Sequence, residues 1–138
     1  MNRFLPDTWL DLLMRPFDMA APEANVYVET VAPDVRLAIV LLLALALGAL
    51  WLWRRRASST TPVNAPVVWL TVLLLVSMVP WFITTGNGRY FVAWLVLLGP
   101  LCVGLLRALP FTAGRKLALA AAVIGMQLFV LSQNTPFG

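Results

Sequence analysis

The feature that most constrains this chain is an unbroken apolar run, residues 37–53, in which seventeen consecutive residues include no polar side chain. An α-helix rises about 1.5 Å per residue, so a span of about 20 residues, and at least about 17, crosses a hydrocarbon core of about 30 Å. A run of this length and composition predicts a membrane-spanning helix.

Three further apolar runs follow, at residues 65–83, 90–106 and 117–131. The first two of these also meet the lower length limit for a span. The last is the shortest and includes Gln127, so it crosses only if Arg115 and Lys116 extend their charged ends to the interface. We predict an all-α integral membrane bundle of four transmembrane helices. A re-entrant or interfacial segment is the alternative for residues 117–131.

Composition excludes several classes of protein. Of the 138 residues 61% are hydrophobic and 12% are charged, against about 25% charged in an ordinary soluble domain. A soluble enzyme or a nucleic-acid-binding domain is excluded, because a chain this short leaves much of its surface in water. The chain has no histidine and a single cysteine, Cys102, so we expect no internal disulfide, no metal site and no cofactor.

Charge placement predicts the orientation of the spans. Residues 1–36 include all six acidic residues and three arginines, whereas residues 37–138 include seven basic residues and no acid. Six of those seven lie between the first and second runs or between the third and fourth: Arg54, Arg55, Arg56, Arg107, Arg115 and Lys116. The positive-inside rule places these two loops in the cytoplasm, and both termini and the 84–89 loop outside.

The segment before the first span, residues 1–36, is predicted to include one short amphipathic helix. Asp7 is a suitable N-cap and Pro16 is expected to end the helix. Its apolar side chains recur at helical spacing, with charged residues on another side: Leu5, Trp9, Leu12 and Leu13 against Asp7, Asp11 and Arg15. We expect this helix to lie in the outer interface. The functional alternative is a gate over an outward-facing cavity.

Residues 22–33 are predicted to be an extended linker that is compatible with one strand. No signal-peptide pattern precedes the first span, since the segment is acidic and has no apolar core of its own. Two readings follow: the chain is the C-terminal piece of a longer membrane protein, or it is a small protein complete in itself.

The four apolar runs contain no Asp, Glu, Lys, Arg or His. Proton-coupled and cation-coupled transporters place a carboxylate inside the membrane, and voltage sensors place repeated arginines there. A stand-alone transporter or channel is therefore not favoured.

The outer loop between the second and third runs is the most polar. Its Gly-Asn-Gly sequence at 86–88 predicts a tight turn. Arg89 and Tyr90 follow, and two functions fit them. They anchor the helix at the interface, or Arg89 binds the phosphate of a lipid-linked substrate with Tyr90 and Asn87 beside it. Thr84 and Thr85 would be hydrogen-bonding neighbours.

The sequence Arg89-Tyr90-Phe91, followed by an apolar helix with Leu98-Gly99-Pro100, is similar to a stretch near the end of the membrane core in bacterial multi-span GT-C-type glycosyltransferases. Those enzymes use polyprenyl-phosphate-linked sugars at the outer face. The resemblance implies that Arg89 contacts the phosphate of the lipid carrier. This chain has four predicted spans where the family has many more, and it has no recognisable acid pair after a first span, so we expect no catalytic residue.

Two other patterns have structural interpretations. Small residues on one side of the last run predict close packing against another helix, within the chain or in a partner: Ala118, Ala121, Ala122 and Gly125. The three arginines at 54–56 and the Ala-Ser-Ser-Thr-Thr-Pro sequence after them predict a topology signal and a cytoplasmic linker, with anionic-lipid binding as the alternative.

The sequence thus predicts an extracytoplasmic segment, residues 1–36, and a four-span domain, residues 37–138, in the inner membrane of a bacterial cell. Its expected partners are the lipid bilayer and other membrane helices or a larger complex, and not nucleic acid. The first function hypothesis is a non-catalytic helix-packing module or subunit. The second is the C-terminal portion of an outer-face glycosyltransferase, with a polyprenyl-phosphate-linked sugar as its ligand.

Overall fold

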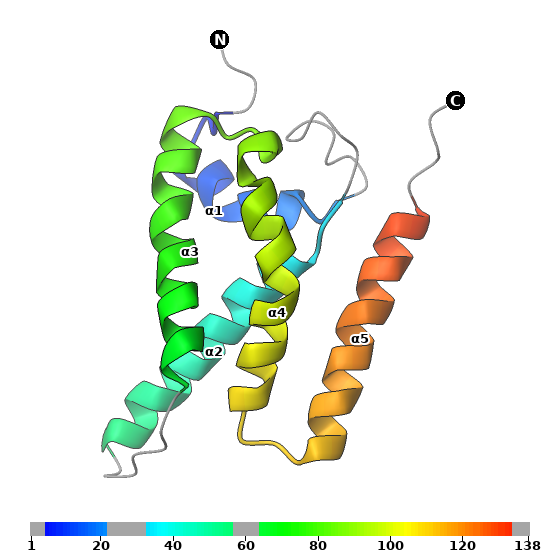
Figure 1. Cartoon of the computed structure of the whole chain (residues 1–138). Helices are drawn as coiled ribbons and strands as arrows, with labels where there is room; N and C mark the ends of the chain where they lie inside the picture. Colours follow the sequence, from blue (N-terminus) through cyan, green and yellow to red (C-terminus); the bar gives the residue numbers. More distant parts are fainter. Residues whose placement is uncertain (1–4, 22–32, 57–63, 134–138) are drawn as a thin grey trace.

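The structure is a computed structural model that describes residues 5–21, 33–56 and 64–133, without the side chains at 55, 56, 88 and 89. These residues are all-α and include no β-strand. The elements are α1 (Trp9–Asp18), α2 (Arg36–Arg56), α3 (Ala65–Thr84), the short 3-10 helix η2 (Gly88–Phe91), α4 (Val92–Ala108) and α5 (Ala113–Ser132) (Figure 1). The linker predicted at 22–33 lies outside the described residues except for Pro33.

Three of the helices are long and apolar enough to cross a membrane: residues Arg36–Arg54 of α2, all of α3 and all of α5. The sequence predicted residues 117–131 as the marginal run, whereas the short helix is α4, with 17 residues. α5 is longer than predicted because it begins at Ala113 and takes Arg115 and Lys116 into its first turn. α4 has the same length as its predicted run but begins and ends two residues later, because the start of the run belongs to η2.

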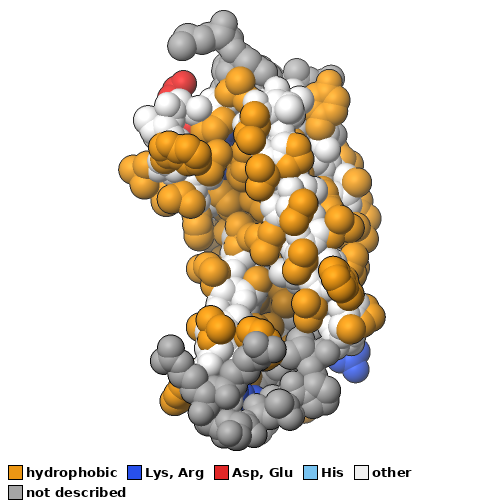
Figure 2. Space-filling view, turned by 90° about the vertical axis from the view of Figure 1, so that its left-hand side faces the viewer, with side chains coloured by type: hydrophobic (Ala, Val, Ile, Leu, Met, Phe, Trp, Pro, Cys, Tyr) orange, Lys and Arg blue, Asp and Glu red, His pale blue; other side chains and the backbone are white. Residues whose placement is uncertain are grey.

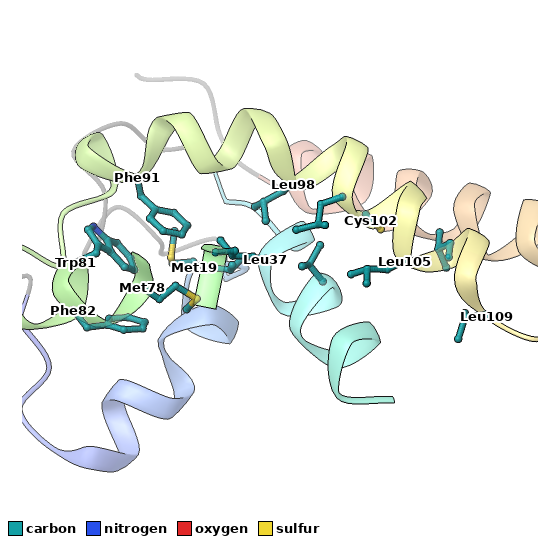
Figure 3. Packing of buried hydrophobic residues seen from close by; sticks show 14 residues of the cluster. Met19, Leu37, Met78, Trp81, Phe82, Phe91, Leu98, Cys102, Leu105 and Leu109 are labelled. Carbon is teal, nitrogen blue, oxygen red and sulfur yellow. The ribbon is translucent and has the colours of Figure 1, made fainter. Parts of the chain in front are cut away.

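α4 is the central helix of the bundle. It contacts α2 most extensively, and it also contacts α3 and α5 (Figure 1). One face of α4 is buried: Leu98, Leu101, Cys102, Leu105 and Leu106. Figure 3 shows Leu98, Cys102 and Leu105 in a core that runs from an aromatic end at Trp81 and Phe91 to Leu109 at the other end. Every other helix is therefore positioned relative to α4, directly or through α2.

The contact between α3 and α4 is close at Gly104. A Cβ atom placed on Gly104 would lie 2.8 Å from Cγ2 of Val67, a residue in the first turn of α3. Valine is stiff about its χ1 angle, so it cannot easily yield. The two helices approach this closely only because position 104 has no side chain.

The α1 helix begins and ends differently from the prediction. Its N-cap is Thr8, whose hydroxyl accepts a hydrogen bond from the Asp11 N–H (3.1 Å), while Asp11 accepts one from the Asp7 N–H (3.0 Å). Thr8, and not Asp7 as predicted, is therefore the N-cap of α1. Pro16 lies inside the helix and does not end it, because the Met19 N–H still bonds to the Arg15 carbonyl (3.0 Å) in the last turn.

The two sides of α1 are also distributed differently from the prediction. Leu12 packs against the core, and the Arg15 side chain is turned into the protein with 1% of its surface exposed. The outward side is apolar: Trp9, Leu10, Leu13, Met14 and Phe17. α1 is amphipathic as predicted, but its apolar side faces away from the bundle.

α5 lies at the edge of the bundle and has no buried residue. It packs through Ala120 and Val123, which touch the core, and through Gln127. The small residues at 118, 121, 122 and 125 are exposed, and nothing lies within 4 Å of a Cβ placed on Gly125. The prediction that this small-residue face packs closely is therefore wrong for helices of this chain in its described part.

The described carboxylates and a group of basic side chains lie at opposite ends of the bundle. The described carboxylates at 7, 11, 18 and 34 are near α1 and the start of α2, whereas Arg107, Arg115 and Lys116 are near the α4–α5 connection. Figure 2 shows this on one face, where an acidic group lies near the upper end, a basic patch lies near the lower end and apolar side chains cover most of the surface between.

Candidate functional site

The α3–η2 turn holds the residues singled out from the sequence. α3 ends where Gly86 takes φ 57°, and the N–H groups of Thr85 and Gly86 both donate to the Trp81 carbonyl (3.1 and 2.8 Å). A residue with a Cβ disfavours this left-handed conformation, so glycine at 86 sets the direction of the turn. The tight turn predicted here is confirmed at this glycine.

Asn87 is turned towards the core, with 8% of its surface exposed. Its backbone carbonyl accepts a hydrogen bond from the indole N–H of Trp81 (2.8 Å) and another from the backbone N–H of Tyr90 (3.2 Å). The Trp81 ring stacks on Phe91, with ring centroids 4.5 Å apart, and contacts Phe82 at 4.8 Å. The aromatic cluster of Trp81, Phe82 and Phe91 therefore holds the turn in place.

The three predicted lipid-phosphate ligands share this turn, and the two whose side chains are described, Asn87 and Tyr90, do not point the same way. Tyr90 points away from the protein, with 74% of its surface exposed, whereas Asn87 is buried. Arg89 lies in η2 between them, and its side chain is outside the described residues. The exposed ring of Tyr90 fits an aromatic anchor at a membrane interface.

The hydroxyl groups of Thr84 and Thr85 are directed at their own helix. Thr84 donates to the Pro80 carbonyl (2.6 Å) and Thr85 to the Trp81 carbonyl (3.5 Å). Two prolines, Pro80 in α3 and Pro100 in α4, lie inside continuous helices.

Two ion pairs, each with one buried partner, lie at the same end of the bundle, and they were not predicted from the sequence. Asp34 is 4% exposed, and its carboxylate receives Nε (2.9 Å) and Nη2 (2.6 Å) of Arg36. A second pair joins Arg15 Nη2 to Asp11 Oδ2 at 3.3 Å. Two-pronged pairing satisfies a buried carboxylate better than a single contact does. The only signals in the sequence were the Asp-x-Arg and Asp-x-x-x-Arg spacings.

Gln127 joins the last helix to the start of the first long one. Its Oε1 accepts from the Val35 N–H (3.0 Å), and its Nε2 donates to the Pro33 carbonyl (3.0 Å). The single polar side chain predicted in the run 117–131 therefore pairs with two backbone groups just before α2, one of them an N–H that has no helical carbonyl to bond to. Nearby, the Asp34 N–H donates to the Met19 carbonyl (2.9 Å), which holds residues 19 and 34 together.

One carboxyl group at this end has a shifted pKa. Burial raises the pKa of Asp18 above its usual value, the negative charge of Asp11 raises it further, and Arg15 partly opposes both effects. The described residues include no cluster of three or more His, Cys, Asp or Glu side chains placed to hold a metal ion.

Comparison with known proteins adds no assignment, because no protein-family model, no curated protein and no solved structure matches this chain. The class that the fold defines is an all-α protein with three helices long and apolar enough to cross a membrane.

Proposed function

We propose that this chain is a multi-pass membrane module that acts by packing with other helices, as a subunit or accessory piece, without catalysis of its own. The observation that carries the proposal is the exposure of its apolar helices: none of the α5 span is buried, and only 17% of the α2 span and 28% of the α3 span are. In water such surfaces would aggregate, whereas lipid and neighbouring helices cover them.

Four spans are proposed because η2 and α4 follow each other without a break. Together they extend about 33 Å, from about 2.0 Å per residue in η2 and about 1.5 Å per residue in α4. That length matches a hydrocarbon core of about 30 Å. Tyr90 would then lie in the interface at the start of the third span.

The orientation is proposed from the separated charges. The positive-inside rule places the end with Arg107, Arg115 and Lys116 in the cytoplasm, in a bacterial inner membrane. The termini and α1 would then be extracytoplasmic. The outward apolar side of α1 would lie in the outer leaflet, with Trp9 at headgroup level.

The packing role is tested by photo-crosslinking in native membranes. A photoreactive residue replaces Ala121, on the exposed small-residue face of α5, and in a matched variant replaces Val123, on the packed face. The proposal predicts an adduct with another protein, or with a second copy, at 121 and an internal product at 123. Adducts with lipid alone at 121 would contradict a packing role for that face.

A second candidate function, the membrane portion of an outer-face glycosyltransferase, is supported by one observation. The Trp81–Asn87 hydrogen bond holds the backbone around Arg89, so a guanidinium at 89 would be presented from a fixed position to a lipid-linked phosphate. With a polyprenyl-phosphate-linked sugar as donor, Arg89→Lys and Arg89→Ala would both lose transfer, since lysine cannot reproduce two-pronged pairing. Full transfer by Arg89→Ala would rule this candidate out.

A further inference from the structure

A shallow hollow of about 360 Å³ lies where the α4–α5 connection meets the first turns of α5. Its lining is apolar except for one cation: Phe111, Ala118, Leu119 and Arg115. All four residues are exposed, so the hollow is open on the surface of the protein. An apolar depression with a single charge at its margin suits an amphiphile, whose charged and apolar parts need different surroundings.

The positive charge at this hollow is not neutralised by any residue that the structure describes. Arg115 makes no hydrogen bond or ion pair with any residue that the structure describes, whereas the neighbouring Lys116 donates to the Arg107 carbonyl (2.6 Å) and caps the end of α4. Residues 37–138 include no acidic residue. Three cations within ten positions therefore face whatever lies at this end of the bundle.

We propose that this hollow binds an anionic phospholipid, with the phosphate on Arg115 and the upper part of an acyl chain against Phe111 and Leu119. The inference rests on the proposed membrane insertion. A guanidinium pairs with phosphate through two parallel hydrogen bonds. A zwitterionic lipid has a phosphate too, but its ammonium group would be repelled by the guanidinium of Arg115, the one cation that lines the hollow, so net negative charge is favoured.

The test uses the full chain purified in detergent and exposed to equal amounts of phosphatidylglycerol and phosphatidylcholine, with retained lipid counted by native mass spectrometry. Wild type is expected to retain one phosphatidylglycerol in preference to phosphatidylcholine. Arg115→Gln is expected to lower that preference by about fivefold, the factor that one basic residue contributes near an anionic surface. Phe111→Ala, which changes no charge, is expected to lower retention of both lipids.

Arg107→Gln is the matched control, because it removes the same charge from the same end of the bundle, in the last turn of α4, at a residue that does not line the hollow. It should retain most of the preference. Equal retention of the two lipids by wild type, an unchanged preference in Arg115→Gln, or an equal loss in Arg107→Gln would each overturn the site. Flotation of the protein with lipid vesicles is measured in parallel, so that failure to insert is distinguished from failure to select a lipid.

Discussion

At the scale of single residues, Gly86 is the position where the backbone depends most on residue type. Its φ of 57° is left-handed, so Gly86→Ala is expected to destabilise the protein by about 1–2 kcal/mol. Gly48→Ala is the control, since a Cβ there meets nothing within 4 Å in the middle of α2. Thermal unfolding in detergent, followed by circular dichroism, should lower the midpoint for the first variant alone. Equal midpoints for both variants would contradict the role of Gly86.

The raised pKa of Asp18 makes the stability of the protein depend on pH in one direction. Because its pKa is raised in the folded protein, the ionised form is disfavoured there, and its contribution to stability falls as pH rises from the ordinary aspartate range through the raised value. Asp18→Asn should therefore be more stable than wild type at neutral pH and equal to it in acid. The gain is about a few tenths of a kcal/mol, because solvent screens a partly buried group. A less stable variant at neutral pH would contradict this sign.

At the scale of elements, Gln127 couples α5 to the start of α2. Gln127→Leu removes both hydrogen bonds and leaves the Val35 N–H without its acceptor, at a cost of about 1–2 kcal/mol. Gln127→Glu keeps an acceptor for Val35 but loses the donor to Pro33, so it should be intermediate. Ser132→Ala, which removes only a bond within α5, should have no effect. Unfolding midpoints in detergent test this order, and a neutral Gln127→Leu would contradict it.

The α3–α4 contact gives a second prediction at this scale. Gly104→Ala forces a Cβ against Val67 and is expected to cost about 1–3 kcal/mol. The same substitution at Gly125, which has open space around it, should be neutral or slightly stabilising. Adding Val67→Ala to Gly104→Ala should restore part of the loss, and a double-mutant cycle of unfolding midpoints measures this coupling. Purely additive effects would show that the contact does not limit the packing.

The positions of the long helices could be predicted from the apolar runs in the sequence. The predicted spans 37–53 and 65–83 lie within α2 and α3. Helix ends were less predictable, because Thr8 and Asp7 are both good N-caps and local hydrogen bonds decide between them. The burial of Arg15 and Asp34 in their ion pairs was not predictable, since spacing cannot show which side of α1 meets α2. The small residues of α5 could face inward or outward, and the bonds of Gln127 fix the packed face on another side.

At the scale of the whole molecule, three features occur together: apolar helices with exposed sides, two ion pairs at the α1 end, and basic residues at the α4–α5 end that form no ion pair with a described residue. The buried carboxylate of Asp34 is tolerated because Arg36 lies within hydrogen-bonding distance of it. Cations without such partners belong at a surface where water and lipid phosphates can meet them. The two ends therefore suit opposite sides of a membrane.

The most direct test of this account is the side of the membrane on which each end lies. Single cysteines replace Thr84, exposed at the end of α3, and Thr112, exposed before α5, in a Cys102→Ser background. With a membrane-impermeant maleimide on intact cells, the account predicts that Thr84→Cys is labelled at once and Thr112→Cys only after permeabilisation. Labelling of Thr112→Cys in intact cells, or of both positions from the same side, would contradict it.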